Sequence, residues 1–132
     1  MGWRKRLLIN KSQIPVQVAT TTPTGKEDSI NVTSPRANSL ITSPLTVTGN
    51  ARGMWYFEAS FPVEILDGNN SRLAVTPAQA QGDWMTENFV PFSVTLNFKQ
   101  PTTATGTLVL HKDNPSGDPS KEDSLRIPIR FK

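Results

Sequence analysis

The sequence of 132 residues contains no cysteine, and only one histidine and one tyrosine. Without cysteine the chain can form no disulfide, no thiolate metal site and no cysteine nucleophile. Near the N-terminus the apolar run Leu7-Leu8-Ile9 is far shorter than the roughly 7–15 residues of a signal peptide core or the about 20 of a membrane span. No window of about 11–18 residues free of proline and glycine has helical periodicity, so we expect very little helix.

Basic residues are also scarce outside the N-terminal part of the chain. The net charge is +3, but residues 1–26 carry five basic residues and no acidic one, which gives +5, from Arg4, Lys5, Arg6, Lys11 and Lys26. The remaining 106 residues carry 9 basic and 11 acidic residues, which gives −2. Nucleic-acid binding requires a basic stripe with exposed aromatics on the folded domain. The pattern therefore predicts no nucleic-acid partner.

This asymmetry divides the chain into two parts. We predict a disordered basic leader and linker over residues 1–27, because residues 20–25 are polar and have nothing to bury. A second interpretation treats this segment as the stub of a longer protein whose upstream membrane anchor is missing. In that interpretation the protein contacts a membrane only through that anchor. Residues 28–132 are predicted to form one domain.

The most informative segment is Trp55–Ile65, where three consecutive aromatic residues are followed by strict alternation. A period of two is typical of a half-buried strand. It assigns five residues to the core: Phe57, Ala59, Phe61, Val63 and Ile65. The intervening Glu58 and Glu64 are assigned to the exposed face.

Further alternating segments surround this one. They are separated by turn signals about every 8–12 residues, such as Asp67-Gly68-Asn69-Asn70. Strands are predicted at residues 30–32, 45–49, 72–75, 92–98, 108–110 and 125–131, with a short strand or bend at 84–86. Together they predict an all-β, immunoglobulin-like sandwich of about seven antiparallel strands in two sheets. Pro128 lies within the last strand and indicates a sheet edge or a bulge there.

The order and spacing of several short motifs resemble the immunoglobulin-like domain of bacterial spore-germination proteins, often found beside a GerMN domain. The motifs are Ile30-x-Val32-x-Ser34-Pro35, Ser43-Pro44-Leu45-x-Val47-x-Gly49-x-Ala51, Phe57-Glu58-Ala59, Gly82-Asp83-Trp84-Met85, Phe92-x-Val94-x-Leu96-x-Phe98, Gly106-x-Leu108-x-Leu110 and Ser116-Gly117. The resemblance covers residues 28–132. It implies an extracytoplasmic accessory domain without catalytic residues, attached to a membrane anchor or lipoprotein. The chain has neither a GerMN partner domain nor a lipoprotein cysteine.

Few residues are candidates for catalysis. We predict that the protein is not an enzyme and that it has no catalytic residue and no cofactor. His111 follows the strand at 108–110, and no serine lies in a nucleophile-elbow motif beside it. Glu58 and Glu64 are six residues apart on the predicted strand, hence roughly 20 Å apart. Glycosidase carboxylates lie about 5–9.5 Å apart.

Segment 113–118 is rich in side-chain oxygens, and one interpretation of it is a calcium-binding loop. Pro115 and Pro119 disturb the ligand spacing of a calcium loop, and Asn-Pro-Ser-Gly is also what an ordinary turn requires. We therefore predict a turn and no metal site.

Three residues form the candidate binding patch. Trp55, Tyr56 and Glu58 adjoin the core part of the aromatic strand, and aromatic residues are frequent interface hot spots. Trp55 can be core or exposed anchor, while Trp84 is predicted to be core. Glu58 can be exposed or can pair with Arg52 or Arg72 across strands.

The predicted function is that of a non-catalytic accessory domain of a bacterial envelope protein, outside the cytoplasm. Its partner would be a protein or a cell-wall glycan, and the domain would be a monomer. Two alternatives stay open: a purely structural spacer without ligand and, more remotely, a hydrolase.

Overall fold

The structure is a computed structural model that describes residues 26–132. The predicted leader over residues 1–27 lies almost entirely outside the described residues. Within residues 26–132, seven strands and two short 3₁₀ helices follow one another: β1 (Ile30–Ser34), β2 (Leu45–Arg52), η2 (Gly53–Trp55), β3 (Ser60–Asp67), β4 (Arg72–Ala80), β5 (Phe89–Leu96), β6 (Thr105–His111), η3 (Pro119–Lys121) and β7 (Ser124–Arg130). The predicted all-β class with seven strands is confirmed. In the described part of the chain, no helix has the length and apolar character needed to span a membrane.

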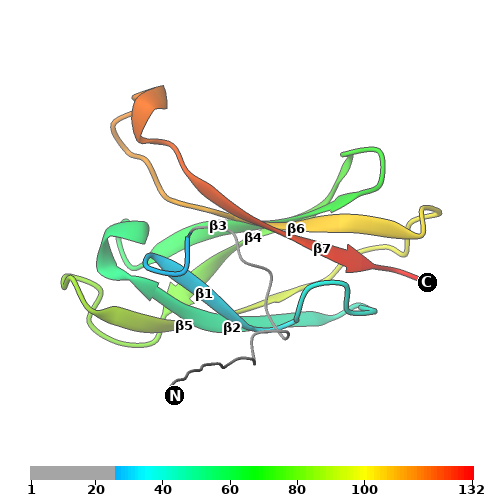
Figure 1. Cartoon of the computed structure of the whole chain (residues 1–132), viewed down its shortest axis with the longest axis horizontal. Coiled ribbons are helices and arrows are strands. Elements are labelled where there is room, and N and C mark those ends of the chain that lie inside the picture. Colours follow the sequence, from blue (N-terminus) through cyan, green and yellow to red (C-terminus); the bar gives the residue numbers. More distant parts are fainter. Residues whose placement is uncertain (1–25) are drawn as a thin grey trace, which may run out of the picture.

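All strand pairs are antiparallel and form one sheet in the order β1-β2-β5-β4-β3-β6-β7 (Figure 1). The predicted division into two separate sheets is not observed. The strands form one sheet because β4 is long: its last residues, Gln79 and Ala80, pair with Ser93 and Phe92 of β5 and so join the two halves.

The sheet is almost closed at its other side. Leu40, between β1 and β2, bridges Arg130 of β7 in parallel, and the Ile41 amide donates to the Arg130 carbonyl at 2.8 Å. β7 is the last strand in the sheet order, which confirms the edge position that Pro128 predicted.

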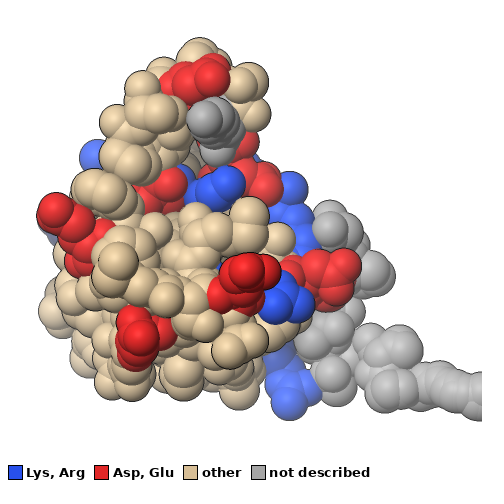
Figure 2. All heavy atoms as spheres, turned by 90° about the vertical axis from the view of Figure 1, so that its left-hand side faces the viewer, with Lys and Arg blue, Asp and Glu red and all other residues tan. Residues whose placement is uncertain are grey.

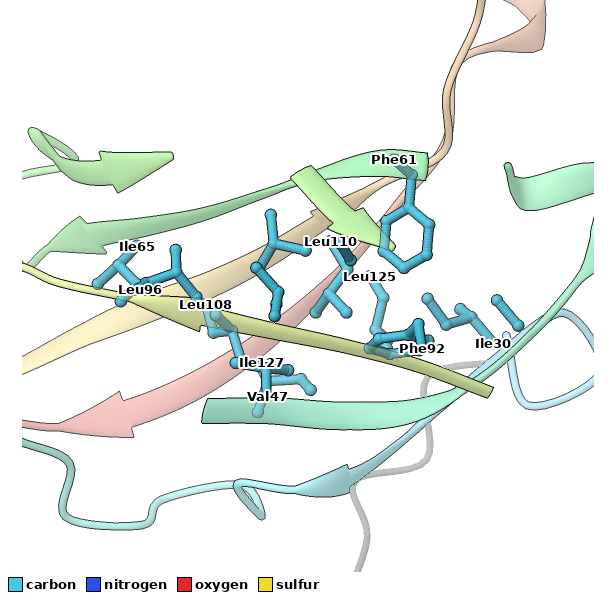
Figure 3. Close-up of a cluster of buried hydrophobic side chains, with 14 of the residues drawn as sticks. Ile30, Val47, Phe61, Ile65, Phe92, Leu96, Leu108, Leu110, Leu125 and Ile127 are labelled. Carbon is cyan, nitrogen blue, oxygen red and sulfur yellow. The ribbon is translucent and has the colours of Figure 1, made fainter. Parts of the chain in front are cut away.

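The core fills the space between the two halves of this folded sheet. Figure 3 shows side chains of β2 and β5, such as Val47 and Leu96, lying opposite side chains of β3, β6 and β7. Phe61 and Phe92 meet edge to face, with their ring centroids 5.0 Å apart. The inward alternation predicted for residues 92–98 and 125–131 is confirmed at residues 92–96 and 125–131, where every second residue is buried. Phe98 lies beyond the end of β5 and is only partly buried against the core.

The aromatic segment does not form one continuous strand. Glu58 and Ala59 have φ values of 52° and 68°, and the Phe57 and Ser60 backbones are hydrogen-bonded to each other across them. These residues form a two-residue turn, so β3 begins only at Ser60. One further prediction differs, because β4 runs on to Ala80. Of the short strand or bend predicted at residues 84–86, the structure has the bend, without strand pairing.

Candidate functional site

The predicted patch of Trp55, Tyr56 and Glu58 is not a continuous surface. Trp55 is 1% exposed and Tyr56 is 4% exposed, so both rings belong to the core. Glu58 is exposed in the turn that precedes β3. The turn reverses the alternation: Trp55 and Tyr56 point inward, while Phe57, predicted to be core, is 40% exposed.

Tyr56 is fixed in the core by its hydroxyl group and by its ring. The hydroxyl donates a hydrogen bond of 2.7 Å to the Val90 carbonyl of β5. The ring meets Phe61 edge to face at a centroid distance of 5.2 Å. Burial raises the pKa of the phenol to about 12, because the phenolate would lose its hydration.

Trp55 is the last residue of η2, and its backbone connects η2 to the loop that follows β6. Its carbonyl accepts a hydrogen bond of 3.1 Å from the Asp113 amide. Its buried indole nitrogen has no hydrogen-bond acceptor among residues 26–132. A buried donor without a partner is destabilising by about 1–3 kcal/mol.

A different apolar surface lies at the end of the molecule where η2 and the loop before β5 meet. We call the following residues the end patch: Met54, Phe57, Trp84, Met85 and Phe89. Met85 is 76% exposed and Met54 is 60% exposed, whereas Trp84 is partly buried against the core. Figure 2 views this end and shows a broad surface without charge, with acidic and several basic side chains around it.

Close backbone packing holds the two segments of the end patch together. A Cβ atom on Gly53 would lie 2.0 Å from the Thr86 carbonyl oxygen and 2.2 Å from that of Trp84. Only glycine permits this approach. The approach places Met54 close to the segment that carries Met85. The Phe57 and Trp84 rings also meet edge to face, at 6.4 Å.

Arg52 fixes the far side of the end patch. Its guanidinium carbon lies 4.3 Å from the centre of the Phe89 ring, a cation–π contact. The guanidinium group also donates to the backbone carbonyls of Asp28 and Glu87. The predicted pairing of Arg52 with Glu58 is not observed: the two Arg52 donors that are used, Nε and Nη1, are directed to these carbonyls.

Three exposed carboxylates adjoin the end patch in sequence, and we call them the acidic rim: Glu58, Asp83 and Glu87. Glu58 follows Phe57 directly, and Asp83 precedes Trp84. The Asp83 carboxylate accepts the Met85 amide at 2.9 Å, which keeps it beside the patch. The end patch therefore combines an apolar centre with a negative edge.

A second cluster of polar residues lies on the outer face of β3, β4 and β6. Glu64 is 8% exposed, although the alternation assigned it to the exposed face. It accepts hydrogen bonds from Arg72 at 2.6 Å and from His111 at 2.9 Å. Burial raises the pKa of Glu64, but hydrogen bonds from His111 and Arg72 outweigh it and lower the pKa overall.

This cluster lacks the other parts of a catalytic triad. Ser124 pairs with His111 across β6 and β7, yet no hydrogen bond joins their side chains in the described residues. Arg72 occupies the second oxygen of Glu64. Among the described residues, Glu64, Arg72 and His111 therefore form an ion cluster centred on the Glu64 carboxylate.

Beside His111, an open cleft of about 590 Å³ lies at the base of the long hairpin loop between β6 and β7. Its lining includes Lys112, Asp113 and Asp123. The oxygens of segment 113–118 bond within the loop: Asp118 accepts the Ser120 amide, and Asn114 donates to the Asp118 carbonyl. Across residues 26–132, no group of three or more acidic or histidine side chains could hold a metal ion. The loop forms the turn that its sequence predicts.

Most of the end patch was not predicted from the sequence. Met54, Met85 and Phe89 lie outside any alternating run, so no pattern distinguished them from scattered surface residues. One signal was present: the large apolar residue Met54 directly follows Gly53. Glycine beside large apolar residues in loops is compatible with close packing of those loops.

The comparison with a protein-family model agrees with the fold. Residues 29–118 match the family model described as the immunoglobulin-like domain of bacterial spore germination, which confirms the predicted resemblance. The match includes the whole end patch. A solved structure of Bifidobacterium dentium beta-glucuronidase complexed with coumarin-3-O-glucuronide is similar over 78% of this chain, with 16% identity and a TM-score of 0.42. The chain covers 17% of that enzyme, and the likeness carries no argument about function. No curated protein sequence matches the chain.

Proposed function

Because the chain belongs to the family of immunoglobulin-like domains of bacterial spore germination, we propose that it is a non-catalytic accessory domain of a bacterial envelope protein. In this proposal it acts outside the cytoplasm and binds a protein partner through the end patch. The end patch is the observation that carries the proposal. It replaces the predicted patch of Trp55, Tyr56 and Glu58.

The composition of the end patch supports binding. Contiguous apolar surface at one end of a monomer is typical of interaction sites, whereas single exposed apolar residues are ordinary. Aromatic residues, methionine and arginine are the residue types enriched at interfaces. Methionine also adapts its shape to a partner. Met54 and Met85, the two most exposed members, supply this adaptable surface.

The same composition favours a protein over a cell-wall glycan. A sugar presents many hydroxyl groups, and each one needs a hydrogen-bond partner when it is removed from water. Met54, Phe57 and Phe89 offer no such group. A protein partner can instead place apolar side chains over the centre and basic side chains at the acidic rim.

The proposal is tested with envelope fractions of the source bacterium and two variants. Met54→Ser/Met85→Ser removes the exposed centre of the patch, and Val75→Ser is the matched control. Val75 is 45% exposed and lies on β4, away from the patch. We expect the domain to be retained by envelope protein and lost after protease treatment of that fraction. The patch variant should bind at least about 10-fold more weakly, whereas Val75→Ser should bind like the natural sequence.

Three outcomes would contradict the proposal. Retention by protein-free cell-wall glycan would identify a glycan ligand. Equal retention of both variants would mean that binding uses another surface. No retention of any form would favour the spacer.

A further inference from the structure

The open cleft of about 590 Å³ at the base of the β6–β7 hairpin loop has no part in the proposed function. Its volume lies within the range of about 300–1,000 Å³ that is typical of small-ligand sites. Its lining is polar and includes charged side chains of both signs, one asparagine and one serine. An apolar ligand would leave these groups without hydrogen-bond partners, so the cleft favours a charged ligand.

Backbone hydrogen bonds fix the walls of this cleft. The Lys112 amide donates to the Asp123 carbonyl at 2.9 Å, which continues the pairing of β6 with β7 by one residue pair. The Asp113 amide donates to the carbonyl of the buried Trp55 at 3.1 Å, which ties the start of the loop to the core. A ligand therefore meets walls that are already formed, and little ordering free energy is lost on binding.

The strand side of the cleft carries a positive charge that the protein itself does not neutralise. Arg126 of β7 lies opposite Val109 of β6, so its side chain shares one face of the sheet with that of His111. Glu64 lies on the same face, but its two oxygens already accept hydrogen bonds from Arg72 and His111. Within residues 26–132, no hydrogen bond or ion pair involves the Arg126 side chain.

The loop side of the cleft carries negative charge in the same condition. Asp113 and Glu122 lie near the two ends of the loop, and in the described part of the chain neither side chain forms a hydrogen bond or an ion pair. Asp123 differs, because its carboxylate binds Lys26 at 2.7 Å and is also attracted by Lys112. The cleft therefore has an available cation at its strand side and available carboxylates at its loop side.

The separation of these charges sets the length of a ligand that can meet both. Arg126 is level with Val109, and Asp113 follows Val109 by four residues, so the two backbones are up to about 13 Å apart along the strands. The charged groups of a free amino acid are separated by one carbon atom. A peptide of two or three residues spans about 7–11 Å, and the side chains of the cleft cover the rest.

We propose that this cleft binds a short peptide whose free ammonium and free carboxylate groups are two or three residues apart. Arg126 binds the carboxylate, for which the fork of the guanidinium group is well suited. Asp113 and Glu122 bind the ammonium group. This second site is separate from the end patch and adds a small-ligand function to the proposed protein-binding one.

The test uses trialanine as the probe, because it carries one ammonium group, one carboxylate and no other charge. Its binding is followed by the backbone amide signals of the chain in nuclear magnetic resonance spectra. We expect saturable shifts at residues 109–114 and 122–126. N-acetylated trialanine lacks the ammonium group and trialanine amide lacks the carboxylate, so each should bind about 3–5-fold more weakly. Free alanine should bind more weakly than trialanine, because it cannot reach both ends.

Variants assign each end of the peptide. Arg126→Gln should bind trialanine and its amide equally, and Asp113→Asn/Glu122→Gln should bind trialanine and its acetylated form equally. The matched control is Arg36→Gln, because Arg36 is not part of this cleft and lines a hollow between β1 and β2. This variant should bind all probes like the natural sequence.

Three results would overturn the inference: no saturable shift with trialanine, equal binding of trialanine and both blocked forms by the natural sequence, or unchanged discrimination in the charge-removal variants. Shifts confined to residues 53–58 and 83–89 would likewise reject the cleft and place the peptide on the end patch. None of the variants changes Met54 or Met85, so failure here is distinguishable from failure of the proposed function.

Discussion

Tyr56 offers a sharp test of the reasoning, because the sequence placed it in a surface patch and the structure places it in the core. Tyr56→Phe removes the hydroxyl that donates to the Val90 carbonyl at 2.7 Å. A net hydrogen bond contributes about 0.5–1.5 kcal/mol, and a buried acceptor left without its donor adds to the loss. We expect a destabilisation of about 1–2 kcal/mol, or a Tm lower by roughly 5–10 °C.

Tyr56→Ala removes the ring as well. Its contacts with Phe61 are lost, so we expect about 3–5 kcal/mol, as for other buried aromatic residues. Urea unfolding followed by tryptophan fluorescence measures both variants. Phe57→Ala is the matched control on the adjacent exposed aromatic, and it should cost less than about 1.5 kcal/mol.

A pH titration tests the burial of Tyr56 independently. Tyr56 is the only tyrosine, so the near-ultraviolet phenolate absorbance reports on this one group. Its pKa is raised from 10.0 to about 12 in the folded chain. The neutral phenol therefore stabilises the fold fully below pH 10, and this contribution is lost as the pH rises through about 12. A phenol that titrates near 10 in the folded protein, or a Tyr56→Ala variant with unchanged stability, would refute the core assignment.

Three other variants test separate parts of the fold. Leu96→Ala should cost about 2–5 kcal/mol in urea unfolding, because Leu96 is fully buried, and a near-neutral value would contradict the inward face of β5. Glu64→Gln should cost about 1–2 kcal/mol near neutral pH. The pKa of Glu64 is lowered from 4.5 in the folded protein, so the ionised carboxylate stabilises the fold above that pH, and this stabilisation is lost as the pH falls through the lower folded pKa. The difference in unfolding free energy between Glu64→Gln and the natural sequence should therefore disappear in acid. A difference that is constant with pH would count against the ion cluster. Ala59→Gly should stabilise the domain by about 1 kcal/mol in thermal unfolding, because glycine accepts the positive φ of the turn, whereas a loss of stability would mean that the turn has another geometry.

The strands that alternate without interruption were predictable from the sequence. In β5 and β7, Phe92, Leu96 and Ile127 point inward as their period of two requires. The predicted edge position of Pro128 also follows from local chemistry, because proline cannot donate to a neighbouring strand. These features depend only on the residue and its nearest neighbours in the chain.

Other features depend on contacts between distant segments, which a single sequence does not reveal. Glu64 occupies an outward position, yet it is buried because Arg72 and His111 from neighbouring strands close over it. The single sheet likewise depends on two pairs at the end of β4, Gln79 with Ser93 and Ala80 with Phe92. No local pattern distinguishes this arrangement from two separate sheets.

The turn at Glu58 and Ala59 explains why Phe57 was wrongly predicted to be buried and why it belongs to the proposed binding surface. Positive φ at both central residues of a two-residue hairpin turn favours Asn-Gly, and Glu-Ala carries no such signal, so the alternation was extended through it. By reversing the chain there, the turn sends Tyr56 into the core and leaves Phe57 outside, against the Trp84 ring. A continuous strand would have placed Phe57 on the inward face together with Phe61. The same local break that made the pattern misleading therefore adds Phe57 to the end patch, whose two segments are held together at Gly53.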